Sequence, residues 1–325
     1  MFRSTKLGLS SFSIKQVSRI REHRILLITF CLFLLILLLS TISPHFLTVS
    51  NILNILRQVS IISIVSIGMT YVIITGGIDL SVGSVLSLSA VLAAIPLNHG
   101  VNIFFSILIS LAVGSICGYL NGILITTRIK MPPFIATLAM MSVARGLSLV
   151  ITSGQPIYGL PKLFGFIAGG YVFGIPFPVI VMIFTYMIGH VYLTHVKTGM
   201  YNYAVGGNQE AARLAGVDIK RIKIYAYVIS GISASVGGII LASRLLSIEP
   251  LAGLGYELDA IAAAVIGGTN LYGGEGNLIG TLIGAITMGI LRNGLNLLNF
   301  SAYWQQVAVG VVIAAVVAIY AFRKE

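Results

Sequence analysis

The chain has 325 residues, of which 57% are hydrophobic and 9% are charged. A water-soluble domain typically carries about 25% charged residues, so this composition excludes a soluble protein. The net charge of +11 would indicate a nucleic-acid partner in a soluble protein. In a chain this apolar it is typical of cytoplasmic loops, which collect Lys and Arg because positive charge resists translocation. We therefore predict an all-α, polytopic protein of the lipid bilayer, with no nucleic-acid partner.

The N-terminal segment, residues 1–24, is basic and precedes the first long apolar run. Its cationic side chains are those of Arg3, Lys6, Lys15, Arg19, Arg21 and Arg24. The apolar run that follows, 25–39, is too long for a removed signal peptide and lacks a small-residue cleavage site. We therefore expect a retained first helix whose N-terminal end lies in the cytoplasm.

The apolar runs predict about ten membrane-crossing helices, since one crossing needs roughly 20 apolar residues. We place them at 25–43, 52–75, 80–96, 103–127, 133–152, 171–193, 223–244, 258–270, 277–298 and 303–321. They form one transmembrane domain, 25–322, with a cytoplasmic loop at 194–222 and a cytoplasmic tail at 323–325. Ten crossings put both termini inside, and the outer loops near 41–51, 97–102 and 299–302 contain no Lys or Arg.

Short or broken helices are expected near 76–96 and 258–276, where glycines interrupt the apolar pattern. Residues 76–84 read GGIDLSVGS and residues 267–275 read GGTNLYGGE. Glycine-broken segments in matching halves are typical of a transporter's substrate path. The similarity fits either an internal repeat or a chance match between glycine-rich sequences. Eight crossings with two re-entrant segments is the alternative topology.

Two further sets of glycines recur at four-residue spacing, which places each set on one helix face. They are Gly114, Gly118 and Gly122, and Gly276, Gly280 and Gly284. Glycine lets helices approach closely in lipid. The sets predict either tight packing inside one subunit or a seam between two subunits.

No energy source is evident in the chain itself. It lacks a GxxxxGK[ST] loop for nucleotide phosphates, and no catalytic arrangement, metal-ligand spacing or cofactor motif stands out. Among the acidic residues, Asp79 alone lies between two closely spaced crossings. Four arginines fall in the outer halves of helices, and either reach the outer headgroups or make contacts within the protein. They are Arg57, Arg145, Arg244 and Arg292.

A short polar helix is predicted in the middle of the chain, where residues 206–216 read GGNQEAARLAG. Asn208 is a suitable N-cap, Glu210 suits the positive end of the helix dipole, and Gly216 can adopt the left-handed conformation that ends a helix. About two turns are too short and too polar to cross a membrane. Such a helix indicates a surface that another protein binds.

This segment resembles the EAA loop of permease subunits in ATP-binding-cassette importers. Glu210, Ala211 and Ala212 are followed after three residues by Gly216, although the Leu-Pro that often closes the fuller motif is absent. Longer stretches are similar to the ribose-type sugar permeases, which serve importers of ribose, xylose, galactose, allose or autoinducer-2. They are GMTYVIITGGIDLSVGSVLSLS from Gly68, PPFIATLAMMSVARG from Pro132 and GYELDAIAAAVIGGTNLYGGEGNLIGTLIGA from Gly255. The resemblance extends from about residue 25 to the C-terminus.

The resemblance implies a transport subunit of the bacterial inner membrane, not an enzyme, that forms the path for a ribose-like or allose-like monosaccharide. An ABC ATPase subunit would bind the coupling loop, at Asn208, Glu210, Ala211, Ala212 and Gly216. A periplasmic sugar-binding protein would dock outside, and a second permease copy would complete the path. The sequence does not name the sugar. Rival functions are an ion-coupled secondary carrier or channel, and a structural subunit without a path.

Two further groups of residues are candidates for function. The acidic residues Glu249, Glu257 and Asp259 either dock the binding protein or belong to a solvated outer loop. Path candidates are Gly76, Gly77, Asp79, Ser81, Asn293 and Asn296. Asp79 is alternatively the cap of the helix that begins near Leu80. Asn293 and Asn296, which share a helix face, alternatively form hydrogen bonds between helices.

Overall fold

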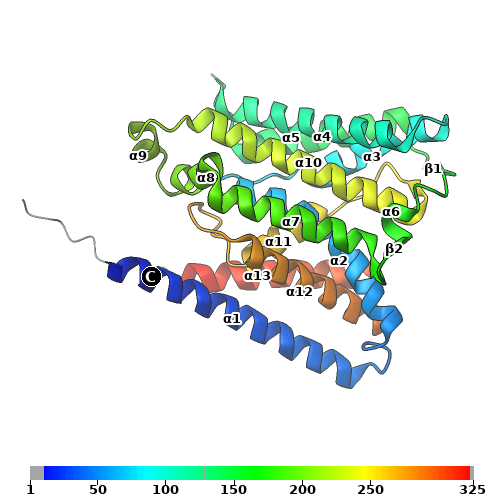
Figure 1. The fold of residues 1–325 in the computed structure, drawn as a ribbon, viewed down its shortest axis with the longest axis horizontal. Helices are drawn as coiled ribbons and strands as arrows, with labels where there is room; N and C mark the ends of the chain where they lie inside the picture. Colours follow the sequence, from blue (N-terminus) through cyan, green and yellow to red (C-terminus); the bar gives the residue numbers. More distant parts are fainter. Residues whose placement is uncertain (1–10, 128, 323–325) are drawn as a thin grey trace, which may run out of the picture.

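The computed structural model describes residues 11–127 and 129–322, which form a bundle of α-helices with two short antiparallel strand pairs (Figure 1). The helices are α1 (Ser11–Ile42), α2 (Val49–Ile74), α3 (Val82–Asn98), α4 (Ile103–Thr126), α5 (Pro133–Thr152), α6 (Phe166–Gly169), α7 (Phe177–His195), α8 (Lys197–Gly207), α9 (Gln209–Leu214), α10 (Ile219–Leu245), α11 (Tyr256–Ile266), α12 (Leu278–Leu297) and α13 (Ala302–Phe322). Strand β1 (Ile157–Tyr158) pairs with β4 (Ser247–Ile248), and β2 (Tyr171–Val172) pairs with β3 (Ile175–Pro176). The all-α prediction is confirmed. The first ten residues, Arg128 and the predicted tail 323–325 lie outside the described residues.

Seven helices in the described part of the chain are long and apolar enough to cross a membrane. They are Ile25–Ile42 within α1, and α2, α4, α5, α7, α10 and α12. The other three predicted crossings correspond to α3, α11 and α13. Helix α3 has 17 residues and α11 has 11, so α11 is only about 16 Å long. These two are the short helices expected near 76–96 and 258–276.

Helices α3 and α11 each complete a crossing that an irregular segment begins. The chain turns at Gly76, whose φ is 78°, and re-enters the bundle before α3 starts. Residues 249–255 likewise descend beside α3, where the Ser87 hydroxyl donates to the carbonyl oxygens of Glu249 and Pro250 at 3.2 and 2.9 Å. Both crossings therefore connect the two ends of the bundle, which favours ten crossings over eight with re-entrant segments.

The first turns of α3 and α11 meet inside the bundle. A Cβ atom built on Gly83 would lie 2.2 Å from the carbonyl oxygen of Gly253, so only glycine permits this approach. From this contact α3 continues for about 22 Å toward Asn98, and α11 continues for about 15 Å in the other direction. The two broken crossings therefore touch near the middle of the bundle.

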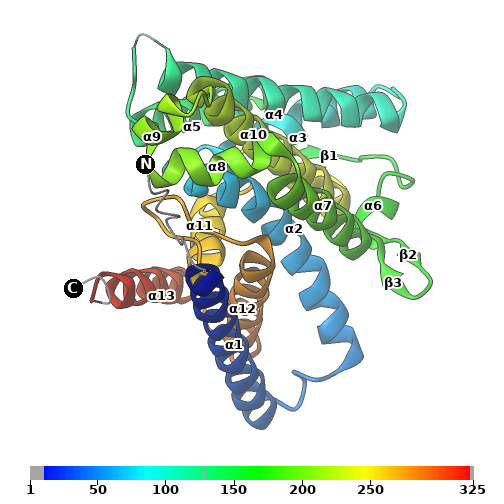
Figure 2. The same cartoon turned by 60° about the vertical axis from the view of Figure 1, so that its left-hand side comes forward.

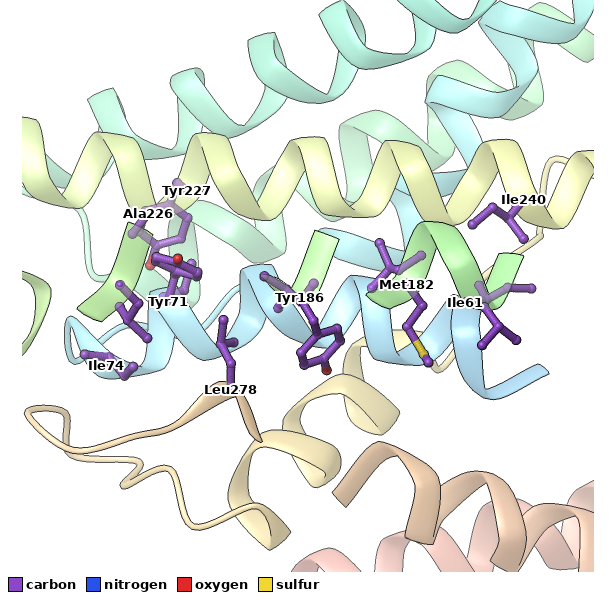
Figure 3. Packing of buried hydrophobic residues seen from close by; sticks show 14 of the residues in the cluster. Ile61, Tyr71, Ile74, Met182, Tyr186, Ala226, Tyr227, Ile240 and Leu278 are labelled. Carbon is purple, nitrogen blue, oxygen red and sulfur yellow. The ribbon is translucent and has the colours of Figure 1, made fainter. Parts of the chain in front are cut away.

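Helices α2 and α10 form the centre of the molecule. In each, 67% of the most apolar window is buried, against 6% in α1. Figure 3 shows α2 side chains, among them Tyr71, packed between α7 and α10. The hydroxyl of Tyr71 donates to the carbonyl oxygen of Gly189 at 2.5 Å, and that of Tyr186 donates to Ser63 at 3.0 Å. Each of these two tyrosine hydroxyls thus has a partner, as burial of a tyrosine requires.

Glycines bring α4 directly against α10. A Cβ atom built on Gly114 or Gly118 would lie 2.2 Å from the carbonyl oxygen of Gly231 or Tyr227, respectively. Without a hydrophobic driving force in lipid, such close backbone packing is a main source of helix association. The first glycine set therefore packs inside one subunit, the simpler of its two interpretations.

Two of the three glycines in the second set also allow close helix packing. Gly280 and Gly284 lie against Gly267 and Ala263 of the α11 segment. Gly276, however, precedes α12 and is not on its helical face. Asn277 explains this start, because its side chain accepts a hydrogen bond from the backbone N–H of Ile279 and so caps α12.

The two ends of the bundle differ in charge. We call them the α9 end and the β1 end; the first turn of α1 and the last turn of α13 both lie at the α9 end (Figures 1 and 2). Cationic loop and helix-end residues gather at the α9 end. They are Lys130, Lys197, Arg213, Lys220, Arg221 and Lys223, against Lys162 and Arg244 near the β1 end.

Three predictions need correction. Helix α1 begins at Ser11, within the segment 1–24 that was expected to precede the first helix, although its apolar crossing starts at Ile25. The helix predicted at 171–193 begins at Phe177, because Tyr171–Pro176 forms the β2–β3 hairpin around Phe173 and Gly174, both at positive φ. Helix α8 was not predicted; its residues were assigned to the loop 194–222. Tyrosine, asparagine and glycine gave this 11-residue helix no apolar pattern.

Candidate functional site

The short polar helix predicted at 209–215 is present as α9, Gln209–Leu214. The side chain of Asn208 accepts a hydrogen bond from the backbone N–H of Ala211 at 3.0 Å, which caps the helix. Gly216 has a φ of 83°, and the left-handed turn that it makes ends the helix. Both local predictions are confirmed.

Helix α9 is joined stiffly to its neighbours. Asn208 alone separates α9 from α8. After α9, residues 215–218 lead directly into α10. The backbone N–H of Val217 returns to the carbonyl oxygen of Ala212, and the side chain of Asp218 caps α10 through the N–H of Arg221. Beneath the helix, Ala212 is buried against Val205 and Ile222. An isolated helix this short would not be stable; these contacts hold it in place.

The outer face of α9 is exposed and mixed in character. Leu214 is 84% exposed. Beside it, Glu210 and Arg213 form a surface ion pair at 2.8 Å. An apolar side chain with charged neighbours has the composition of the core and rim of a protein interface. We call Gln209–Leu214 with Asn208 and Gly216 the α9 surface.

Inside the bundle, Asp79 is held in a polar cluster at the start of α3. Its side chain is 1% exposed. One carboxylate oxygen accepts from the backbone N–H and the hydroxyl of Ser81, at 3.0 and 2.6 Å. The other accepts from the hydroxyl of Ser230 on α10 at 2.7 Å, and Asn121 on α4 donates to Ser81. The N-cap of α3 is Ser81, which makes no side-chain cap hydrogen bond. Asp79 therefore does not cap the helix, as one interpretation of the sequence expected, but holds Ser81 and fixes the irregular segment to α10.

The acidic residues considered for docking separate in the structure. Glu249 is exposed near the β1 end. Glu257 lies half-buried inside the bundle, where its carboxylate is close to Gly83. Asp259 is 1% exposed and forms an ion pair with Arg292 of α12 at 2.7 Å. Only Glu249 of the three is therefore on a surface that an outer partner can reach.

The four outer-half arginines all contact other parts of the same chain. Arg145 donates to the carbonyl oxygens of Pro250 and Ala252 at 2.8 and 2.9 Å. Arg244 donates to Asn54 at 2.9 Å. Arg57 hydrogen-bonds the hydroxyl of Tyr171, and Arg292 pairs with Asp259. Arginine's planar group of donors suits such fixed contacts, so these residues tie helices and irregular segments together.

The two asparagines of α12 do not act together. Asn293 is buried and exchanges two hydrogen bonds with Asn51 of α2, at 3.0 and 2.8 Å. Asn296 is exposed on the same helix. Of the remaining path candidates, Gly76 is exposed at the α9 end, whereas Gly77 and Ser81 are buried. Asn293 thus forms a hydrogen bond between helices, which was the alternative to a place in the path.

Sequence reasoning missed the residues that hold Asp79 and the second irregular segment. These are Asn121, Ser230 and Ser87, each a polar residue within an apolar helix. Such residues in membrane helices usually face the bundle and bond across it, which was the available signal. Among the described residues no group of His, Cys, Asp and Glu is arranged to hold a metal ion.

Comparison with known proteins gives consistent matches along nearly the whole chain. The chain is 48% identical over 296 residues to the ribose import permease protein of Bacillus subtilis (strain 168), covering 90% of this chain and 91% of that protein. It is 45% identical over 286 residues to the ribose import permease protein of Escherichia coli (strain K12), covering 87% and 89%. It is 37% identical over 292 residues to the D-allose transport system permease protein of the same strain, covering 89% of each. No solved structure matches the chain.

The family model described as "Branched-chain amino acid transport system / permease component" matches residues 51–317. This range begins in α2 and ends in α13, so it includes both broken crossings and the α9 surface. The chain belongs to this family of membrane permease components.

Proposed function

We propose that the chain is the membrane subunit of an ATP-driven importer and forms the path for a monosaccharide. Ribose is the preferred cargo, because the two ribose permeases are 48% and 45% identical to the chain and the D-allose permease is 37% identical. Because the described residues offer no nucleotide-binding loop, a separate ABC ATPase subunit supplies the energy.

The observation that carries this proposal is the α9 surface. It is a short helix, capped at both ends, exposed on its outer face and joined to α8 and α10 by very short links. A stiff projection of this kind can pass a displacement from a bound partner into the bundle. Leu214, Glu210 and Arg213 are the side chains that the ATPase subunit contacts first, because they are the exposed ones.

Charge supports the orientation that we propose. Six cationic loop and helix-end residues lie at the α9 end and two, Lys162 and Arg244, near the β1 end, and cationic loops are retained in the cytoplasm. The α9 end and both termini are therefore cytoplasmic, and the β1 end faces the periplasm across the inner membrane. A periplasmic sugar-binding protein docks at the β1 end, where Glu249 is exposed.

We propose that two copies of the chain enclose the path. In each copy the exposed Gly76 and the adjoining Gly77 border its cytoplasmic opening. Asp79 and Ser81 are buried within one subunit, so they shape the start of α3 without touching sugar. Asn293 has the same supporting role through Asn51, and Asn296 is the exposed member of the pair.

The mechanism that follows is alternating access. ATP binding closes the ATPase pair and displaces α9, and the helices attached to it rock so that the path opens to the docked binding protein. Hydrolysis then restores the inward-facing state. The broken crossings suit this motion, since irregular backbone inside a membrane protein is tolerated only where it is buried in protein or lines a cavity.

An ion-coupled secondary carrier is the rival function, and two of the carboxylates inside the bundle, Asp79 and Asp259, argue against it. A coupling carboxylate must be free to exchange its ion or proton. Asp79 is occupied by three hydrogen-bond donors, and Asp259 is paired with Arg292. Both are engaged in holding helices together.

Copurification tests the proposal. The tagged chain, expressed with the ABC ATPase from the same operon, is expected to retain that ATPase in detergent. The double variant Glu210→Lys, Leu214→Asp should reduce the retained ATPase at least tenfold. The matched control, Asp218→Asn, changes an adjacent exposed residue but keeps its cap and should leave retention unchanged. Retention that is equal in all three proteins would contradict the proposed coupling surface.

A further inference from the structure

Three segments that are distant in sequence meet at the α9 end through close backbone contacts, beside which the Tyr203 hydroxyl of α8 donates to the carbonyl oxygen of Gly276 at 3.1 Å. They are the last turn of α8, the end of α2 and the loop between α11 and α12, which runs beside α8 in Figure 1. The backbone N–H of Gly274 donates to the carbonyl oxygen of Ile74 at 2.9 Å. This bond joins the α11–α12 loop to the last residue of α2.

Gly206 of α8 is pressed directly against that hydrogen bond. A Cβ atom built on Gly206 would lie 1.8 Å from the carbonyl oxygen of Ile74 and 2.5 Å from the backbone nitrogen of Gly274. Gly273, at a φ of 89°, continues the contact: its own Cβ position is 2.9 Å from the nitrogen of Gly76 and 3.0 Å from the oxygen of Gly206. We call Gly206, Ile74, Gly76, Gly273 and Gly274 the glycine contact.

The glycine contact lies between the α9 surface and both broken crossings. Gly206 is two residues before Asn208, which caps α9. Ile74 and Gly76 lead within a few residues to Asp79 and the start of α3, while Gly273 and Gly274 belong to the loop that follows α11. Since Asn208 is the one residue between α8 and α9, a displacement of α9 reaches this position first.

Backbone contact is suited to passing on a displacement. A side chain can change rotamer and absorb movement, but at Gly206 no side chain lies between the three segments. Close-packed protein interiors have low compressibility and pass strain to their neighbours. Movement of α8 therefore pushes the end of α2 and the α11–α12 loop together.

We propose that Gly206 is a positioning residue for transport: it delivers the displacement of α9 to both broken crossings at once, through Ile74 and Gly274. This inference rests on the proposed function. It identifies Gly206 as the residue at which the displacement caused by the ATPase passes from α9 to the broken crossings. It predicts that a single methyl group at this position uncouples ATP hydrolysis from sugar movement without preventing the ATPase from binding.

The chain supplies a matched control in the next residue. Gly207 occupies the same helical turn, and a Cβ atom built on it would meet nothing within 4 Å. Gly206→Ala and Gly207→Ala change helix propensity equally, so they differ only in the contact. At position 206 the methyl group must move roughly 1.6 Å away from Ile74, the difference between 3.4 and 1.8 Å.

The test uses the complete complex of permease, ATPase and binding protein in proteoliposomes, with ribose as the transported sugar. Gly206→Ala is expected to retain the ATPase within about twofold of wild type, yet to lower ribose transported per ATP hydrolysed at least tenfold. Gly207→Ala should stay within twofold of wild type in both measurements. Equal coupling in the two variants would overturn the inference, as would a Gly206→Ala loss confined to the amount of assembled complex.

Hydrogen–deuterium exchange on the wild-type complex keeps the inference testable if Gly206→Ala does not assemble. Addition of a non-hydrolysable ATP analogue should change exchange in peptides covering 72–81 and 268–277 together with the peptide covering 204–215. A change confined to 204–215 would overturn it. Failure of the wild-type chain to retain any ATPase would instead refute the proposed function, so the two failures are distinguishable.

Discussion

The ion pair between Asp259 and Arg292 gives the sharpest test of how the second broken crossing is held. It joins α11 to α12 at 2.7 Å, and the Asp259 side chain is 2% exposed against 28% for Arg292. We consider three variants that avoid new polar groups: Asp259→Leu, Arg292→Met, and the two combined. They are expected to differ because the two partners are buried to different degrees.

The expected magnitudes follow from burial. Removing one partner of a buried ion pair costs about 3–5 kcal/mol, because the remaining charge is left without compensation. Arg292→Met leaves the carboxylate of Asp259 with almost no access to water, so its cost should lie in this range. Asp259→Leu leaves a guanidinium that is 28% exposed and can recover part of its hydration, so we expect about 2–3 kcal/mol. Replacing both with apolar residues should cost about 1 kcal/mol or less.

Reversible unfolding in detergent, followed by circular dichroism, measures these differences as a double-mutant cycle. The exposed pair Glu210–Arg213 is the control, and Glu210→Gln should change stability by no more than about 1 kcal/mol. The reasoning would be refuted if the double variant were as unstable as the sum of the two single variants, or if Asp259→Leu cost more than Arg292→Met.

Three other predictions use the same structure. Gly118→Ala places a methyl group 2.2 Å from the Tyr227 carbonyl oxygen and should destabilise the protein by about 1–3 kcal/mol in thermal denaturation. Gly146→Ala, which meets nothing within 4 Å, should be neutral or slightly stabilising. Asp79→Asn retains an acceptor oxygen for Ser81 and should transport within about tenfold of wild type, whereas Asp79→Ala should lose transport altogether; equal activities would refute a positioning role for this contact. Leu214→Ala should weaken ATPase retention in copurification while leaving the melting temperature of the permease close to that of wild type.

Much of the helical framework could be predicted because each membrane helix appears in the sequence as a long apolar run. A crossing needs about 20 apolar residues, so the long helices were placed within a few residues of their observed ends, except for the starts of α1 and α7. The α9 helix was equally visible, since Asn208 and Gly216 are strong boundary signals. Glycine spacing showed that α4 packs closely, although it did not name α10 as the partner.

The parts that could not be predicted depend on contacts between distant segments. Nothing in the local sequence shows that 249–255 descends into the bundle, since its depth is set by Arg145 and Ser87 on other helices. For that reason Glu257 and Asp259 seemed to belong to an outer loop. Helix α8 was missed because its polar and glycine residues carry no helical pattern; packing, as where Gly199 lies against the carbonyl of Tyr192, positions it instead.

The central claim is that a bundle without its own energy source is moved by a partner that holds α9. Uptake of radiolabelled ribose into proteoliposomes tests it most directly. We predict accumulation against a gradient only when ATPase, binding protein and ATP are all present with the permease. Uphill accumulation by the purified chain alone, driven by a proton or sodium gradient, would contradict the account.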